Sequence, residues 1–424
     1  MRKLVPVFAA LAVVAVQLLW WTLTPRGTIE TDVGYYWAYV SLVPEHGFGP
    51  VLPEYPLPAA ILLWLPTLFV STFPAYFNVF WLVNAALCLV FAWALWRVGE
   101  RPALIWLAGL AAAGPLSLFR FDLWPGLLVA LALWNYARPV RWSVLLAAGT
   151  ALKVWPVLIW PLGGWKWRRL WPALLSAVLV VGVCLAIAGP ERLLSPFTWQ
   201  GERGLHIEAL LALWILVARL FTDRWEAGLS DNNSVDFTGP GVQATLVVGS
   251  VLWVLFIAAA LALAWWVGRH RSVTAVALAV NWVLWTMLAV NKVFSPQYLM
   301  WALPAFAVLW LVARRPLPRW WIPAVLMISF LTGLTYPLFY DYLFNGPAWV
   351  ATVGLVVRGV LLVALSVSLA VRIRDVSTER GTHVARHHSG RRRRHAPVAA
   401  VSPKPAQVSA GPARSRADAA AGDI

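Results

Sequence analysis

The chain has 424 residues, of which 61% are hydrophobic and only 12% are charged, and its mean hydropathy is +0.71. Soluble globular proteins are about 45–50% apolar, so this composition excludes a soluble enzyme. The formal net charge of +16 lies in short loops between hydrophobic runs and in the C-terminal segment. This is the positive-inside pattern, so we expect an all-α polytopic membrane protein that binds no nucleic acid.

The N-terminus carries Arg2 and Lys3 before an apolar run at 4–23. That run is too long for the core of a signal peptide, and no A-x-A site follows it, which favours an uncleaved first span entering from the cytoplasm. The stretch 31–58 then brings acidic, aromatic, Gly and Pro residues together. We expect an external, substrate-facing loop here, with Asp32 near the water interface, or else acting only as the N-cap of a helix beginning near Gly34.

Further hydrophobic runs follow, and the direction in which each crosses the membrane is assigned so that the basic loops lie on the cytoplasmic side. We expect crossings at 75–96, 103–119, 123–137, 142–162, 171–188, 242–267, 273–290, 299–312, 320–336 and 349–371. We expect interfacial helices at 57–73 and 209–221, and external segments at 189–208 and 222–240. Lys153 and Pro156 interrupt the run at 142–162, and two short helices meeting near Lys153 keep the basic cluster at 166–169 inside. The total is about twelve spans with both termini cytoplasmic.

The C-terminal segment 373–424 has ten Lys/Arg and four Asp/Glu, a net charge of 10 − 4 = +6. It lacks hydrophobic periodicity, so a disordered basic cytoplasmic tail is expected after a transmembrane domain at 1–372. Membrane lipids with anionic headgroups are one candidate partner, and a solvated tail without a specific partner is the alternative.

Under this topology five polar clusters end on the extracytoplasmic face. They are Asp32 with Glu54, Arg120 with Asp122, Lys153, Arg203 with His206 and Glu208, and Lys292 with Gln297. Ionisable groups at membrane depth are costly, which indicates a functional use. One carboxylate among several cations suits a reaction in which a base removes a hydroxyl proton while a phosphate leaves.

Each of these residues also has a structural interpretation. Arg120 and Asp122 can pair across a turn, Lys153 can snorkel from a helix end, and His206 can be an interface residue. The segment 292–298 can be a polar turn in which Pro296 starts a helix. Motifs for nucleotide-driven transport, zinc proteolysis and serine hydrolysis are missing from the sequence, and because Gly34 stands where a second acid would follow Asp32, we expect a metal-free site.

Several short motifs together resemble the actinobacterial members of glycosyltransferase family 87, integral-membrane enzymes of the GT-C fold. The motifs are the Asp after the first span, Tyr55-Pro56-Leu57-Pro58, Arg120 with Asp122, Lys153 with Pro156, Arg203-Gly-Leu-His-Ile-Glu208 and Lys292-Val-Phe-Ser-Pro-Gln-Tyr298. The second proline of the Tyr-Pro-Pro pattern is displaced to position 58. The resemblance covers about residues 4–371 and leaves out the tail.

The resemblance implies a GT-C glycosyltransferase-like fold and a polyprenyl-phosphate sugar donor, with mannose as the expected hexose and a glycolipid or glycan as acceptor. It implies that Asp32 is the catalytic base. We expect the donor phosphate at Lys292, Arg203, His206 and Lys153, and further substrate contacts at Glu54, Tyr55, Arg120, Asp122, Glu208, Gln297 and Tyr298. The expected location is the plasma membrane with an extracytoplasmic active site; a transporter or flippase of lipid-linked sugars, and a non-catalytic scaffold, are the alternatives.

Overall fold

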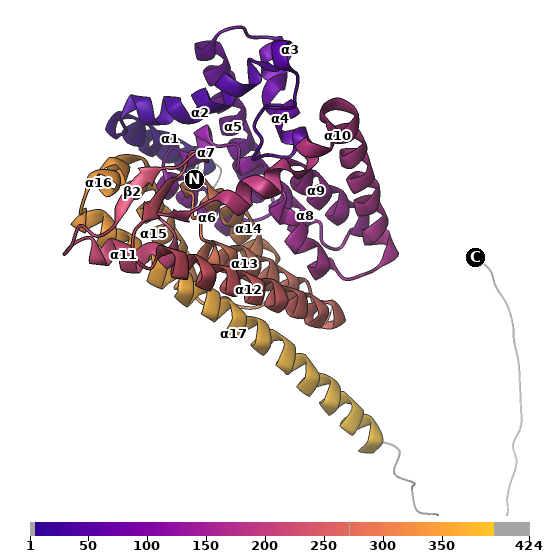
Figure 1. Cartoon of the computed structure of the whole chain (residues 1–424). Coiled ribbons are helices and arrows are strands. Elements are labelled where there is room, and N and C mark those ends of the chain that lie inside the picture. The colour runs from indigo at the N-terminus through magenta and orange to yellow at the C-terminus, as the bar shows by residue number, and fades with distance from the viewer. Residues whose placement is uncertain (1–4, 271, 394–424) are drawn as a thin grey trace, which may run out of the picture. The chain divides into compact units, whose positions relative to one another are not determined.

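A computed structural model describes residues 5–270 and 272–393, most of which are helical (Figure 1). The described residues up to Ser377 form one compact unit. The helices of the first half are α1 (Val5–Leu23), α2 (Arg26–Val40), α3 (Val43–His46), α4 (Leu57–Trp64), η1 (Leu65–Leu68), α5 (Phe73–Trp96), α6 (Glu100–Ala113), α7 (Leu116–Phe119), α8 (Leu123–Trp134), α9 (Pro139–Leu152) and η2 (Trp155–Gly163).

The second half contains the longest helices and a small sheet. Its helices are α10 (Trp167–Glu202), η3 (Leu210–Ala212), α11 (Leu213–Ala218), α12 (Val242–His270), α13 (Val273–Val290), η4 (Pro296–Tyr298), α14 (Leu299–Val312), α15 (Trp321–Gly333), η5 (Leu334–Phe339), α16 (Tyr340–Asn345) and α17 (Trp349–Arg393). Its strands are β1 (Leu205–His206), β2 (Glu226–Leu229) and β3 (Val235–Thr238).

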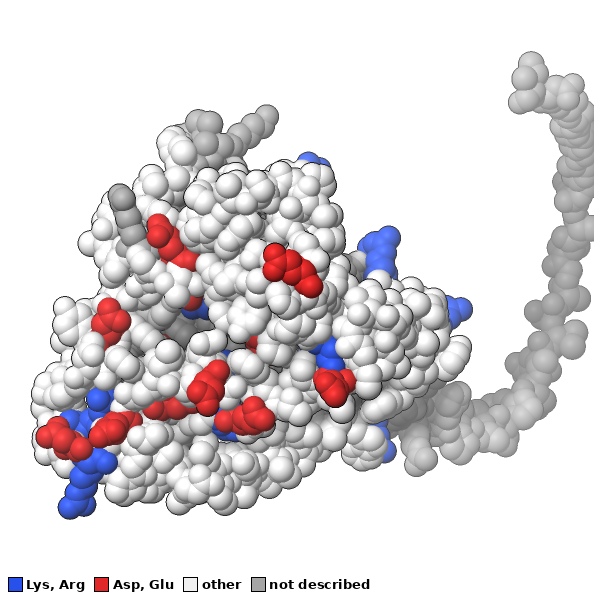
Figure 2. Space-filling model, turned by 45° about the horizontal axis from the view of Figure 1, so that its top comes forward, with Lys and Arg blue, Asp and Glu red and all other residues white. Residues whose placement is uncertain are grey.

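The helices divide into those that face outward and those enclosed by others. In α10 and α12 only 17% of the most apolar window is buried, whereas in α13 the share is 78%. Apolar side chains that remain exposed along a whole helix need a hydrocarbon surrounding, so α10 and α12 face lipid and α13 is central. On the face that Figure 2 shows, most of the surface is uncharged, and several acidic side chains gather across its middle.

Six of the described helices are long and apolar enough to cross a membrane, and there are seven if Phe8–Leu23 and Gly27–His46 count as one broken span. The protein is therefore a helical membrane protein, as expected. The predicted total of about twelve spans stays a prediction, because several expected crossings are short apolar helices, among them Leu57–Leu68, Leu123–Trp134 and Pro296–Val312.

The expected loop at 31–58 is wrong in its first part. Helix α2 includes Asp32, which is neither in a loop nor at an N-cap. The axis bends by 96° between α1 and this segment. Pro25 lies at the bend, and because it has no backbone N–H it cannot continue the hydrogen-bond pattern of α1. The sequence after the bend then forms a new helix that leads Asp32 back against the protein.

The region at 189–208, which was expected to be external, is helical for most of its length. Helix α10 continues to Glu202 after a break at Gly189, whose φ of 79° suits glycine. Beyond it, the three strands form an antiparallel sheet in the order β1-β3-β2. The sheet departs from the all-α expectation, and its register places His206 opposite Asp236.

The observed ends of α9 and α17 test two of the predicted boundaries. Helix α9 ends at Leu152 and η2 begins at Trp155, which confirms the predicted interruption near Lys153. Helix α17 continues to Arg393, past the expected domain boundary at 372, and the rest of the predicted disordered tail, 394–424, lies outside the described residues.

The basic loops, which were all assigned to the cytoplasmic side of the membrane, and the helix ends beside them contact one another. The guanidinium of Arg101 lies 4.1 Å from the ring centre of Trp310, and the backbone N–H of Arg314 donates to the Thr274 hydroxyl at 3.2 Å. The Ser143 hydroxyl donates to the carbonyl of Arg169 at 2.7 Å. These contacts agree with the predicted grouping of the basic loops.

The core depends on a close approach between α8 and α14. A Cβ on Gly126 would collide with the carbonyl oxygen of Met300, so only glycine fits there. We expect Gly126→Ala to destabilise the protein by about 1–3 kcal/mol, the usual range for overpacking, seen as a lower thermal midpoint of the detergent-purified protein. Gly182→Ala is the control, because nothing lies within 4 Å of its Cβ; equal midpoints for the two variants would contradict this account.

Candidate functional site

Asp32 is held by two donors from distant segments. The Arg120 Nη2 lies 2.6 Å from Asp32 Oδ2, and the Tyr336 hydroxyl donates to the same oxygen at 2.6 Å. Arg120 also lies over the Tyr336 ring, 5.2 Å from its centre. The Asp32 side chain is 15% exposed, so the carboxylate is paired and oriented while it keeps some access to a cavity.

The expected pair between Arg120 and Asp122 is wrong. The backbone at Arg120 is extended, with φ −124° and ψ 134°, but at Asp122 it is helical, with φ −60° and ψ −17°. The extended conformation that would place both side chains on one face therefore does not continue to Asp122. Asp122 is instead fully buried and accepts from Lys153 Nζ at 2.7 Å and from the Trp301 indole at 2.6 Å. Two separate ion pairs therefore lie at this turn.

A polar chamber of about 210 Å³ surrounds Asp32. Its walls come from α2, the turn after α7, the sheet, the segment before α14, and η5 with α16. The lining residues are Asp32, Arg120, Arg203, His206, Leu229, Asn233, Ser234, Val235, Val293, Ser295, Pro296, Gln297, Tyr336 and Tyr340. Hydroxyl, amide and guanidinium groups predominate, which suits a ligand with several hydrogen-bonding groups.

A second, larger cavity of about 560 Å³ is a mostly apolar groove between η2, α10 and α12. Its apolar lining includes Trp155, Val157, Leu158, Pro196, Phe197, Trp253, Val254, Ile257, Met287, Val290 and Trp301. Three of the neighbouring rings stack, since Trp155 lies 5.0 Å from Trp301 and Trp301 lies 3.9 Å from Tyr298. Such a surface suits a hydrocarbon chain, and its charged residues are only Glu54, Lys153 and Lys292.

One segment of the chain separates the groove from the chamber. Asn291, Lys292 and Tyr298 line the groove, whereas Val293 and the residues 295–297 line the chamber. The Arg203 guanidinium, on the chamber side, donates to the Tyr298 hydroxyl at 3.1 Å. The two cavities therefore share a wall, and Arg203 is hydrogen-bonded across it.

The cations near this wall differ in how they are held. Lys153 is paired with Asp122 and lies 4.8 Å from the ring centre of Tyr55. Lys292 donates to the carbonyl of Gly201 at 3.1 Å. Partial burial lowers the pKa of Lys292, against the opposing effect of the Asp236 carboxylate. An anion bound beside Lys292 would favour its protonated form.

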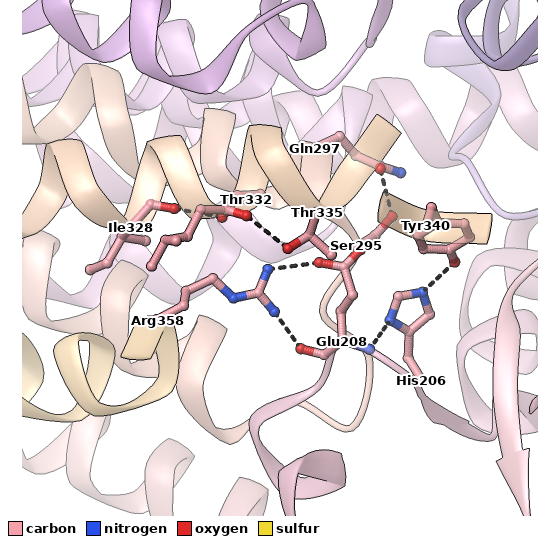
Figure 3. A network of polar contacts seen from close by, with 10 residues as sticks. His206, Glu208, Ser295, Gln297, Ile328, Thr332, Thr335, Tyr340 and Arg358 are labelled. Atoms are coloured by element: carbon pink, nitrogen blue, oxygen red, sulfur yellow. Dashed lines mark hydrogen bonds and ion pairs between the residues drawn. The ribbon is translucent and has the colours of Figure 1, made fainter. Parts of the chain in front are cut away.

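His206 differs from the cationic phosphate ligand that the sequence suggested. Burial, and then the charges of Arg203 and Arg358, lower its pKa from 6.5 to about 3, so the ring is neutral at pH 7. Figure 3 shows the ring between two partners: Nδ1 accepts from the Glu208 backbone N–H at 3.2 Å, and Nε2 lies 3.5 Å from the Tyr340 hydroxyl. Because Nδ1 accepts, the proton is on Nε2 and points to the Tyr340 oxygen.

Glu208 lies behind the chamber rather than in it. Its side chain is fully buried, and Arg358 donates to both its carboxylate at 2.7 Å and its carbonyl at 2.6 Å (Figure 3). Glu208 is not among the residues that line either cavity. Its place is therefore to anchor the strand that carries His206, in contrast to the expected contact with substrate.

The loop that carries Glu54 and Tyr55 is fixed from α10. Arg192 donates to the carbonyls of Val51 and Leu52, both at 3.0 Å. Tyr55 is buried against Phe121 and Lys153, and Glu54 lines the groove. Burial raises the pKa of Glu54, partly offset by hydrogen bonds from a backbone N–H and from Tyr35.

The sequence reasoning missed several residues of the site. Tyr336 is the last residue of an expected span, and Tyr340 lies four residues beyond it. Two tyrosines close to Pro337 in an apolar run were the feature of the sequence that could have indicated a site. Asn233 and Asp236 fall in a stretch interpreted only as an external loop. Arg358 stands alone in the apolar run 349–371, and a single charge there indicates a buried partner.

Comparison of the chain with protein-family models, with curated proteins and with solved structures gives no match. Within residues 5–270 and 272–393, no three His, Cys, Asp or Glu side chains are grouped so that they could hold a metal ion. The features of the molecule that indicate a function are therefore the chamber, the groove and the wall between them.

The buried neutral state of His206 predicts a pH effect on stability. Between pH 6.5 and about 3 the unfolded chain binds a proton at His206 that the folded protein does not bind. The contribution of the neutral His206 ring to the free energy of unfolding is complete above pH 6.5. It is lost as the pH falls, by about 2 kcal/mol at pH 5. We expect the thermal midpoint to fall less between pH 7.5 and 5.0 in His206→Gln than in the wild type.

The exposed His46 provides the control for this measurement. His46→Gln should keep the wild-type pH dependence of the thermal midpoint. If His206→Gln and His46→Gln both lost as much stability on acidification as the wild type, the assigned neutral state of His206 would be wrong.

Proposed function

We propose that the protein is an integral-membrane glycosyltransferase that moves a hexose, with mannose as the expected sugar, from a polyprenyl-phosphate donor to a glycolipid or glycan acceptor. The observation that carries the proposal is the adjacency of an apolar groove, three cations at its wall and a chamber containing one carboxylate. The motifs that resemble glycosyltransferase family 87 support the same assignment.

The groove fits the lipid part of such a donor. A polyprenyl chain is a long unsaturated hydrocarbon, and the groove offers Trp155, Trp253 and Trp301 with aliphatic residues from η2, α12 and α13. Because α10 and α12 face lipid, a chain in the groove stays close to the hydrocarbon of the bilayer. The polar end of the donor would then lie at Lys153, Lys292 and the wall.

The reaction needs cations for the leaving phosphate and a base for the acceptor hydroxyl. A bond forms between the acceptor oxygen and the anomeric carbon, and the bond from that carbon to the phosphate oxygen breaks. The electron pair leaves with the phosphate, whose added negative charge Lys292, Lys153 and Arg203 can stabilise. The acceptor hydroxyl loses its proton to a base, and Asp32 is the carboxylate that lines the chamber.

The proposed orientation follows from the grouping of the loops. Basic loops that contact one another are assigned to the cytoplasm under the positive-inside rule. The chamber and the wall residues come from the opposite set of loops, so the active site would face the extracytoplasmic side of the plasma membrane, with both termini cytoplasmic. The donor would enter from the bilayer and the acceptor from the water-exposed side.

Substitution of the base gives the central test. We expect Asp32→Asn to lower transfer from radiolabelled polyprenyl-phosphate mannose into glycolipid by at least about 100-fold, because general-base catalysis contributes on that order. Glu30→Gln is the matched control, since Glu30 is an exposed acid on the same helix. Membrane vesicles holding each variant at equal, folded levels are compared by thin-layer chromatography of the lipid products.

The proposal fails if Asp32→Asn vesicles transfer sugar at the wild-type rate. It also fails if wild-type vesicles move the labelled donor across the membrane without forming a new glycosidic bond, which is the behaviour of a flippase. Covalent transfer that is lost in Asp32→Asn and kept in Glu30→Gln supports it.

The cations of the wall give an independent prediction. We expect Lys292→Met to reduce kcat/KM for the donor by about 100-fold, the usual loss when one charge-stabilising donor is removed. Lys166→Met is the control, because Lys166 is exposed and belongs to the other set of loops. Equal kcat/KM values for Lys292→Met and the wild type would remove Lys292 from the phosphate site.

A further inference from the structure

The oxygens of Asp32 are not equivalent. Arg120 Nη2 and the Tyr336 hydroxyl both contact Oδ2, each at 2.6 Å. No hydrogen bond to Oδ1 is formed by any residue in the described part of the chain. Asp32 lines the chamber, so the oxygen that is left for a ligand in the chamber is Oδ1.

The donors on Oδ2 have different consequences. Arg120 supplies a charge, which a guanidinium keeps at any working pH. Tyr336 supplies a neutral hydroxyl, whose single proton is directed at Oδ2 and fixes the rotation of the carboxylate. A carboxylate with one oxygen occupied by two donors presents the other oxygen in one orientation, which a base in proton transfer needs.

Tyr336 is itself held in place from the far side of the chamber. Its ring meets that of Tyr340 edge-on at 5.2 Å. The Tyr340 oxygen lies 3.5 Å from His206 Nε2, whose proton points to it, because Nδ1 accepts from the Glu208 N–H. Glu208 is anchored by Arg358 on α17 (Figure 3). A chain of contacts thus connects a membrane helix to the orientation of Asp32.

We propose that Tyr336 is a positioning residue of the transfer reaction: with Arg120 it occupies Oδ2 of Asp32, so that Oδ1 takes the proton from the acceptor hydroxyl. This inference rests on the proposed function. The acceptor proton passes to Oδ1, the acceptor oxygen bonds to the anomeric carbon, and the sugar–phosphate bond breaks with its electrons on the phosphate. Tyr336 keeps its own proton throughout.

The pH profile separates this role from a purely structural one. The groups facing Asp32 are Arg120, Arg203, Tyr36, Tyr336, Tyr340 and His206. The guanidinium and phenol groups of this set ordinarily titrate at about pH 10 or above. Burial lowers the pKa of His206 to about 3. Within this set, Asp32 is the group whose titration can give an acid limb in kcat/KM between pH 4 and 8. A hydrogen bond to the charged form favours that form, so its removal raises the pH of the limb.

The experiment measures kcat/KM for transfer by the purified full-length protein from pH 4 to 9. We expect the acid limb of Tyr336→Phe to lie about one pH unit above that of the wild type, equal to a roughly tenfold lower rate at pH values below the limb. Tyr342→Phe is the matched control, since Tyr342 is an exposed tyrosine on the adjoining helix α16, and its limb should coincide with the wild type.

A second variant covers the case in which Tyr336→Phe does not fold. Tyr336→3-fluorotyrosine keeps the ring and the hydroxyl but makes the hydroxyl a stronger donor, so its acid limb should move to lower pH. Limbs that coincide with the wild type in the folded Tyr336 variants would overturn the positioning role. Transfer that survives in Asp32→Asn would instead overturn the proposed function, so the two failures are distinguishable.

Discussion

The arrangement of this protein depends on the cost of a charge that is removed from water. An unpaired carboxylate or guanidinium inside a protein costs several kcal/mol, and the penalty falls when an opposite charge and further hydrogen bonds are supplied. Three largely buried pairs meet this requirement, namely Asp32 with Arg120, Asp122 with Lys153, and Glu208 with Arg358. Each pair joins segments that are far apart in the sequence. Together they fix α2, the turn before α8, the end of α9, the segment after β1 and α17 around the chamber and the groove.

Two cations at the wall between the cavities lie outside these ion pairs. Among the described residues, Arg203 and Lys292 have hydrogen bonds to Tyr298 and to a backbone carbonyl but no carboxylate within ion-pair distance. Lys153 shares its charge between Asp122 and the faces of aromatic rings. Such an arrangement favours an anion, and the groove beside it favours an anion that carries a hydrocarbon chain.

The sequence was sufficient for the parts of this picture that depend on composition and on local breaks. Apolar runs predicted the membrane helices, and Lys153 with Pro156 predicted the interruption between α9 and η2. The sequence also predicted that the segment 292–298 lies on the same face as the acidic and basic residues that the structure places near it. These features depend on hydropathy and on proline, which act within a few residues of their own position.

The partners of the charged residues could not be obtained in the same way. Arg120 and Asp122 are separated by one residue, and sequence spacing favoured their pairing, whereas the fold gives each a partner from another helix. The neutral state of His206 depends on its complete burial beside Arg203 and Arg358, which only tertiary contacts create. The bend at Pro25 changed Asp32 from an expected loop residue into a helical one, because a new helix can start directly after a proline.

The division between groove and chamber also accounts for how one site could handle substrates of opposite character. Lys153 and Lys292 line the groove and Asp32 lines the chamber, so in the proposed reaction the leaving phosphate and the base lie on opposite sides of the segment 291–298. A direct displacement at the anomeric carbon needs this separation, because the attacking oxygen and the leaving oxygen approach and depart in line. The hydrogen bond from Arg203 to Tyr298 crosses the same boundary. Because Tyr298 lines the groove, this hydrogen bond holds the Arg203 guanidinium where the two cavities meet, and there it could stabilise charge on the phosphate as the bond breaks.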